Sequence, residues 1–218
     1  MGAITRSIAN NITTSGVFTS SAITNNSVTG ITVLANAPAD GITFISSQTA
    51  SSSASLSFTS GLDSTYKAYK FVFVNIRPAT DVAQFSFNLS TDAGSNYNVT
   101  KTTSAFRHYH SEDDLETSLG YFADMDLAQS TAFQPITYYS GNQASGNNSG
   151  SLLLFNPSST TYVKHFISDM AERSRDGALI QNYKIAGYGN TTSACNAIQF
   201  KFHSGNIAAG KIYLYGIK

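Results

Sequence analysis

The sequence predicts an all-β protein, a jelly-roll-type antiparallel β-sandwich preceded by an extended N-terminal arm. Three observations lead to this prediction. From residue 42 onward, apolar and polar residues alternate with a period of two in about ten short runs. Turn-forming residues separate these runs, and the chain is rich in Phe and Tyr, with 14 and 12 residues. Many short alternating strands are typical of two packed antiparallel sheets.

Residues 1–45 differ from the remainder of the chain and are predicted to form a docking arm. The only charged residues in this block are Arg6 and Asp40. Its apolar residues are too irregularly spaced for a helix or a long strand and too numerous for plain disorder. Such a segment cannot bury enough of its own surface to offset the entropy of ordering, so we expect it to pack against another subunit or a neighbouring protein. The alternative is a low-complexity leader. The apolar residues are Ile8, Ile12, Val17, Phe18, Ile23, Val28, Ile31, Val33 and Leu34.

Residues 46–218 are predicted to form the sandwich domain, which a turn at NAPADG introduces. The first runs are SASLSFTSG and YKAYKFVFVNI. In the second run, aromatic residues at 69, 71 and 73 alternate with Val72, Val74 and Ile76, which predicts a strand covered on both faces. The later predicted strands are AQFSFNLS, NYNVTKTTSAFRHYH, TAFQPITYYS, SLLLFNP, TYVKHFISDMAER, YKIAGYG, NAIQFKFHSG and GKIYLYGIK.

One segment, SEDDLETSL, predicts one or two helical turns inserted between strands. Ser111 is placed to cap the helix, and Asp114 follows three residues later, as in a capping box. Leu115 and Leu119 are four residues apart and would share one face of the helix.

The composition indicates a polar but uncharged surface. Charged residues make up 12% of the chain, and 13 basic residues balance 13 acidic ones to a formal net charge of zero. No basic cluster predicts binding to nucleic acid. A surface with little mutual repulsion suits a subunit held in an assembly. No run of apolar residues has the length of a signal peptide or a membrane span, so we expect synthesis in the cytoplasm and no membrane insertion.

The densest group of functional side chains lies in FRHYHSEDD. His108 and His110 are two residues apart, so on a strand both imidazoles point to the same side and are weak candidates for holding a metal ion. Glu112 or Asp114 would add a carboxylate, and a further ligand would have to come from another segment. The alternative is a solvent-facing strand end. The aspartates of STDAGSNYN and DMDLAQS are likewise open to calcium binding or to ordinary turn formation.

The residue patterns favour a protein that is not an enzyme. No G-x-S-x-G motif occurs, and Cys195, the single cysteine, has no histidine near it in sequence. We expect its thiol to be buried as a small apolar group. Most acidic residues stand beside turn residues, where Asp is expected for local backbone hydrogen bonds. We therefore expect no catalytic residues and no cofactor.

Tyrosines near the predicted loops are candidates for contact with a glycan. An aromatic ring can stack on the C–H face of a sugar while neighbouring polar groups bind its hydroxyls. Tyr97, Tyr109 and Tyr121 are placed for this role. The alternative is that each tyrosine packs in the sandwich with its hydroxyl at the rim of a sheet.

Four segments together resemble virion structural proteins of tailed bacteriophages, especially the fibre-like proteins of marine cyanophages. They are ITRSIANNITTSGVFTSSAITNNSVTGIT, ISSQTASSSASLSFTSGLDSTYKAYKFVFVNIRPATD, DAGSNYN and GNIAAGKIYLYGIK. The resemblance covers most of the chain and is most distinctive in the TSGLDSTYK run and the LYGIK ending. It implies a non-enzymatic viral structural protein that docks on the virion through its N-terminal arm and exposes its β-domain, commonly as a homotrimer.

The function expected from these observations is that of a short fibre subunit on the tail or a capsid decoration subunit. Its expected partners are further copies of itself and, through residues 1–45, other phage tail or capsid proteins. The expected location is the virion. The alternative is a lectin-like receptor-binding module that contacts host-surface glycans during host attachment.

Overall fold

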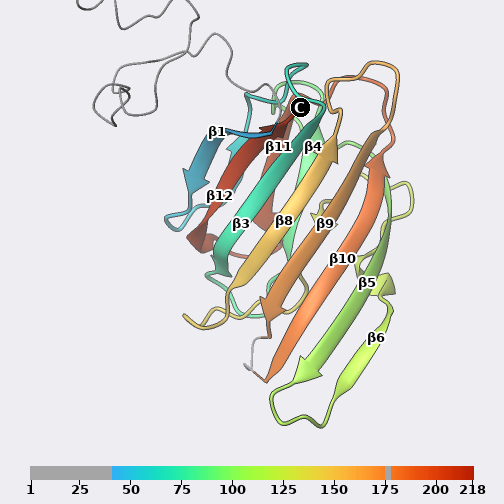
Figure 1. Ribbon diagram of the computed structural model, residues 1–218. Helices are drawn as coiled ribbons and strands as arrows, with labels where there is room; N and C mark the ends of the chain where they lie inside the picture. The colour runs from blue at the N-terminus through green and yellow to red at the C-terminus, as the bar shows by residue number, and fades with distance from the viewer. Residues whose placement is uncertain (1–40, 175–177) are drawn as a thin grey trace, which may run out of the picture. The chain divides into compact units, whose positions relative to one another are not determined.

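The computed structural model describes residues 41–174 and 178–218, and these form two packed antiparallel sheets (Figure 1). The larger sheet has eight described strands in the order β1-β12-β3-β8-β9-β10-β5-β6, and the smaller has four in the order β2-β11-β4-β7. The strands of the larger sheet are β1 (Ile42–Thr49), β12 (Ile207–Ile217), β3 (Ala68–Pro78), β8 (Asn148–Phe155), β9 (Lys164–Arg173), β10 (Leu179–Gly189), β5 (Lys101–Ser111) and β6 (Thr117–Tyr121). Those of the smaller sheet are β2 (Leu56–Phe58), β11 (Ala197–Phe202), β4 (Phe85–Ser90) and β7 (Gln134–Pro135).

The predicted antiparallel β-sandwich is confirmed. A short 3-10 helix, η2 (Ala123–Met125), follows β6. Within the described parts of the chain, no helix has the length and apolarity required to cross a bilayer.

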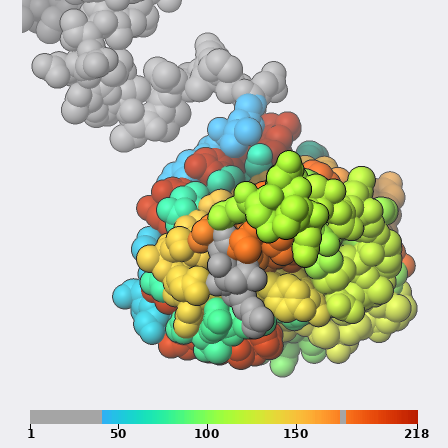
Figure 2. Space-filling model, turned by 90° about the horizontal axis from the view of Figure 1, so that it is seen from below, coloured from blue at the N-terminus to red at the C-terminus, as the bar shows by residue number. Residues whose placement is uncertain are grey.

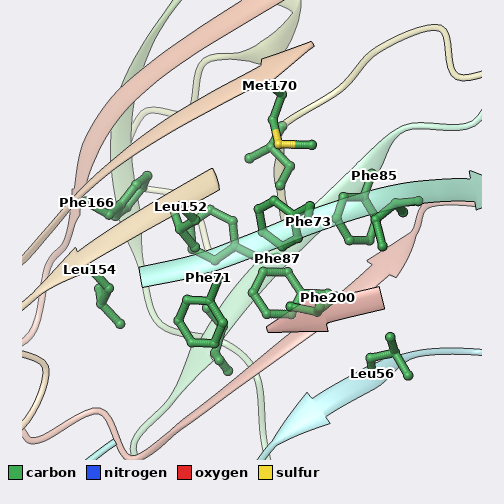
Figure 3. Close-up of a cluster of buried hydrophobic side chains, with 14 of the residues drawn as sticks. Leu56, Phe71, Phe73, Phe85, Phe87, Leu152, Leu154, Phe166, Met170 and Phe200 are labelled. Carbon is green, nitrogen blue, oxygen red and sulfur yellow. The ribbon is translucent and has the colours of Figure 1, made fainter. Parts of the chain in front are cut away.

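Phenylalanine side chains fill the space between the sheets. Phe71 and Phe73 of β3 point toward Phe85 and Phe87 of β4 and Phe200 of β11 (Figure 3). The ring of Phe200 lies 5.2 Å from the rings of both Phe71 and Phe73, measured between centroids. All five rings are buried. Period-two alternation therefore produces the core, because every second residue of a strand points to the same side.

The strand β3 is not covered on both faces, and this prediction was wrong. Tyr69, Phe71 and Phe73 point inward and are buried, but Val74 on the opposite face is 39% exposed. The smaller sheet covers only one face of the larger sheet. Apolar residues on both sides of a strand therefore did not mean two covered faces.

The C-terminal strand β12 lies inside the larger sheet, between β1 and β3. Its register with β3 is irregular at two points between Ile207 and Lys211. Gly210 has a φ of +119°, and a Cβ at this position would lie 2.7 Å from the Asn75 carbonyl oxygen. Glycine therefore allows the two backbones to approach closely at the irregularity.

The predicted helix at residues 111–119 is absent, and a hairpin between β5 and β6 takes its place. Ser111 ends β5, and its Oγ accepts hydrogen bonds from the backbone N–H of Leu115 and of Glu116, the latter at 2.8 Å. Asp114 adopts a left-handed φ of +61°. The prediction failed because Leu119 also alternates with Tyr121, and pairing with β5 stabilises the extended form of this segment.

The predicted arm lies mostly outside the described residues, since residues 1–40 are not among them. Residues 42–45, which were predicted to belong to the arm, form the first half of β1. Ile42 pairs with Ile217 and Phe44 with Tyr215, so this stretch is part of the larger sheet.

Candidate functional site

The face of the larger sheet that points away from the smaller sheet carries many apolar side chains. We call it the open face; it consists of the outward-pointing residues of the eight strands. In Figure 1, β4 and β11 lie behind the larger sheet. On the open face, Ile167 of β9 is 51% exposed and Phe106 of β5 is 49% exposed. Other apolar side chains that alternation places there are Phe44, Val72, Leu153, Phe155, Tyr188, Tyr213 and Tyr215.

Shallow hollows lie between these side chains. One of them has a volume of about 490 Å³, and Phe155, His165, Ile167 and Tyr188 contribute to its lining. A second hollow of about 260 Å³ lies beside Leu153 and also borders Ile167. Ile167 is therefore a central residue of the open face.

The middle of the open face carries one ion pair and, beside Leu153, the further charge of Lys70. Lys184 of β10 forms an ion pair with Asp169 of β9. Asn182 Nδ2 donates a hydrogen bond of 2.6 Å to Asp169 Oδ1. Burial opposes ionisation of Asp169, but the hydrogen bonds from Asn182 and Lys184 outweigh it, so the pKa of this carboxyl is lowered. This part of the surface suits contact with another protein surface of low charge.

The two histidines predicted as weak metal candidates lie on the open face of β5, near its end. His110 Nε2 lies 2.9 Å from Asp114 Oδ1. His203 lies apart from them, and its Nδ1 accepts a hydrogen bond from the Gln84 backbone N–H. His165 is also on the open face, but on β9, where it packs beside Tyr188. In residues 41–174 and 178–218, no three His, Cys, Asp or Glu side chains gather closely enough to hold a metal ion.

The three tyrosines predicted for glycan contact lie apart. Tyr121 is on the open face of β6, and its hydroxyl donates to Asp126 Oδ2 at 2.5 Å. Tyr97 lies in the connection between β4 and β5, where its carbonyl oxygen accepts a hydrogen bond from Asn88 Nδ2 at 2.8 Å. Tyr109 points to the other side of the larger sheet, opposite to the open face. The structure therefore does not gather them into one site.

Tyr109 borders a cleft of about 430 Å³ at the end of the sandwich. The cleft is also lined by Arg107, Glu116, Tyr139 and Gln181. The guanidinium carbon of Arg107 lies 4.9 Å from the ring centroid of Tyr109, and it also lies 4.2 Å from the ring centroid of Phe122. Aromatic rings, a cation and an amide therefore lie together in this cleft, and one of the rings belongs to a residue predicted for glycan contact.

Beneath this cleft lies Glu172, a buried carboxylate whose role the sequence did not reveal. Its Oε1 accepts hydrogen bonds from the Tyr139 backbone N–H at 3.0 Å and from Gln181 and Tyr183. Its Oε2 accepts from Ser140 Oγ and from the Tyr138 backbone N–H, at 3.0 and 3.1 Å.

These five donors do not fully compensate the loss of water around the carboxylate. Burial therefore raises the pKa of Glu172 to about 7, although the hydrogen bonds to Tyr139, Ser140 and Tyr138 act in the opposite direction. Glu172 holds the segment before β8 against β9 and β10. Its only sequence signal was an acidic residue at an inward-pointing position of an alternating strand.

Two buried lysines were also missed by the sequence patterns. Lys101 Nζ donates to Asn88 Oδ1 at 2.6 Å and to the Val99 carbonyl oxygen at 2.8 Å. Lys164 Nζ donates to backbone carbonyl oxygens, the closest being those of Tyr162 and Ser159. Burial lowers the pKa of Lys101 to about 7. Both lysines satisfy internal acceptors, so they serve the fold rather than an exposed site.

Cys195 is buried, as expected, and burial raises the pKa of its thiol to about 11. A thiol of this kind is a poor nucleophile at neutral pH.

Comparison with known proteins adds no relative. The chain matches no family model, no curated protein and no solved structure.

Proposed function

We propose that this protein is a non-enzymatic structural subunit of a bacteriophage virion, which assembles with other copies of itself into a short tail fibre or a capsid decoration. The residues before β1 would attach it to other phage proteins, and the β-sandwich, which includes residues 42–45, would be the exposed head. The phage context rests on the sequence resemblance. The observation that carries the structural role is the open face of the larger sheet.

The open face supports this role because it exposes apolar side chains across neighbouring strands. Large apolar patches on a protein surface usually mark an interface. The ion pair between Lys184 and Asp169 lowers the cost of burying these two charges, although Lys70 adds a further charge beside Ile167. The formal net charge of zero also suits a subunit that is held in an assembly.

The interior polar groups support a structural role over a catalytic one. Glu172 and Lys101, two groups with strongly shifted pKa values, are both buried and hydrogen-bonded to internal partners. Each holds together segments that are distant in sequence. Neither therefore faces a substrate in this structure.

The proposal is tested on the full chain and on phage particles that carry it. We expect native mass spectrometry of the purified chain to show an oligomer, and immunogold labelling to place it on the tail or the capsid. Ile167→Lys, in the centre of the open face, is expected to reduce assembly. Tyr162→Lys, at an exposed position in the connection before β9, is the matched control. A stable monomer that is missing from particles would contradict the proposal.

A further inference from the structure

The described part of the larger sheet ends on β1 at one side and on β6 at the other, and both edge strands lack the charged residues and prolines that usually prevent strand pairing between molecules. The sequences are ITFISSQT and TSLGY, with no charged residue and no proline. Natural sheets commonly protect a free edge with lysine, proline or a covering segment. A register irregularity between Phe44 and Ser46 is the one such feature in β1.

The hairpin of β5 and β6 projects from the body of the domain. All five residues of β6 are exposed, and Leu119 retains 76% of its accessible surface. In Figure 1, the lower ends of β5 and β6 extend beyond the strands of the smaller sheet. In Figure 2, the green atoms of this region form one side of the molecule. A hairpin with exposed apolar side chains that the described residues leave uncovered is a candidate contact with another chain.

The opposite edge carries matching apolar residues. Phe44 of β1 is 55% exposed, and Ile42 is also exposed. Both lie on the open face, as do Leu119 and Tyr121 of β6. A sheet that continued from β6 of one molecule into β1 of another would therefore place these apolar side chains on the same side.

The directions of the two edge strands allow such a continuation. Every neighbouring pair in the larger sheet is antiparallel, so the eight strands alternate in direction. With an even number of alternating strands, β1 and β6 run in opposite directions. A second copy related by a rotation about an axis along the strands would then present its β1 antiparallel to β6 of the first.

Charge favours the same arrangement. The acidic hairpin tip, residues 112–116, contains Glu112, Asp113, Asp114 and Glu116 and stands at the start of β6. Lys211 pairs with Thr49, which is the last residue of β1. Antiparallel pairing places the start of β6 beside the end of β1, and this brings the acidic tip of one copy toward Lys211 of the other.

We propose that β6 of one copy pairs antiparallel with β1 of a second copy, so that copies join head to tail and close into a ring. The proposal rests on the proposed function, since it names the partner and the surface through which the subunit assembles. Head-to-tail contacts close into a ring when the rotation between copies permits it and otherwise form a filament.

The test uses two variants of the full chain, Leu119→Lys on the edge of β6 and Phe44→Lys on the edge of β1. Each is expected to abolish the oligomer that the wild-type chain forms at micromolar concentration. Both positions are exposed, so circular dichroism and thermal unfolding should show an unchanged fold. Tyr162→Lys, remote from both edges in sequence and at an exposed position, is the control and should keep the wild-type oligomer.

Mixing the two variants distinguishes this interface from others. The Leu119→Lys chain retains an intact β1 edge, and the Phe44→Lys chain retains an intact β6 edge. The mixture is therefore expected to form a one-to-one heterodimer by native mass spectrometry, and no larger species. The strand pairing would be overturned if the wild type is oligomeric but the single variants remain assembled, or if their mixture gives no heterodimer. Either result would leave the proposed assembly role intact. A monomeric wild type would contradict the strand pairing, and one that is also missing from particles would contradict the proposed function as well.

Discussion

The two faces of the larger sheet use the same strands for opposite purposes. Inward-pointing residues of β3 are aromatic and fully buried against β4 and β11, whereas outward-pointing residues of the same strand include Lys70, Val72 and Val74 on the open face. The inner face is completed within one chain. The open face leaves apolar surface that the described residues do not cover, so the comparison separates what stabilises the fold from what we propose to be available for assembly.

The largest loss of stability is expected when an aromatic ring is removed from the inner face. Phe200→Ala is expected to lower the free energy of unfolding by about 3–5 kcal/mol, because it opens a cavity among Phe71, Phe73 and Phe85. Urea unfolding followed by circular dichroism measures the change. A loss well below 1 kcal/mol would mean that the core does not depend on this cluster.

A smaller change in the free energy of unfolding is expected when the pH is varied, because of the buried carboxylate of Glu172. The pKa of Glu172 is about 7 in the folded chain and 4.5 as its ordinary value. The folded chain therefore binds this proton more tightly, and stability should fall as pH rises from about 4.5 to about 7. The expected change is about 3 kcal/mol.

The Glu172→Gln variant should lose the slope that Glu172 contributes between these pH values. It should also be less stable, because its amide N–H₂ would face backbone donors at Tyr138 or Tyr139. Unfolding at several pH values provides the measurement. An unchanged slope in the variant would show that Glu172 does not titrate in this range.

Lys101, the buried lysine beside β4, should affect the free energy of unfolding in a different pH range. Lys101→Met is expected to cost about 1–3 kcal/mol, because Asn88 Oδ1 and the Val99 carbonyl oxygen lose a donor. The pKa of Lys101 is lowered from 10.5 to about 7, so the wild-type chain should gain stability as pH rises from 7 toward 10.5. The deficit of the variant should therefore grow with pH. A deficit that stays constant over this range would argue against a neutral buried amine.

The smallest effect on stability is expected on the open face. Ile167→Ala should change the free energy of unfolding of the monomer by no more than about 0.5 kcal/mol, because the side chain is half exposed in the folded chain. Its effect should appear in assembly instead, measured as weaker self-association in sedimentation equilibrium. A loss of stability as large as that of Phe200→Ala would show that the two faces do not differ as described.

Much of the fold could be predicted from the sequence, because alternation is a local property. The runs that contain Phe71, Phe73, Phe85 and Phe200 identify strands without knowledge of their neighbours. The run of β3 did not show that only one of its sides is covered. The secondary structure of residues 111–119 could not be decided from the sequence, because the spacing of its leucines fits a helix and their alternation with neighbouring residues fits a strand. Only pairing with β5 decided between the two.

The sequence by itself determined the sandwich class, the aromatic core and the low surface charge, because these depend on residue type and period. Tertiary structure alone decided which face of the larger sheet remains open, and that β1 and β6 form its two edges. It also decided that Glu172, Lys101 and Lys164 are buried. The reason is physical: burial and strand order depend on contacts between residues far apart in the chain, such as Lys101 with Asn88 and Glu172 with Ser140, and no local pattern encodes these contacts.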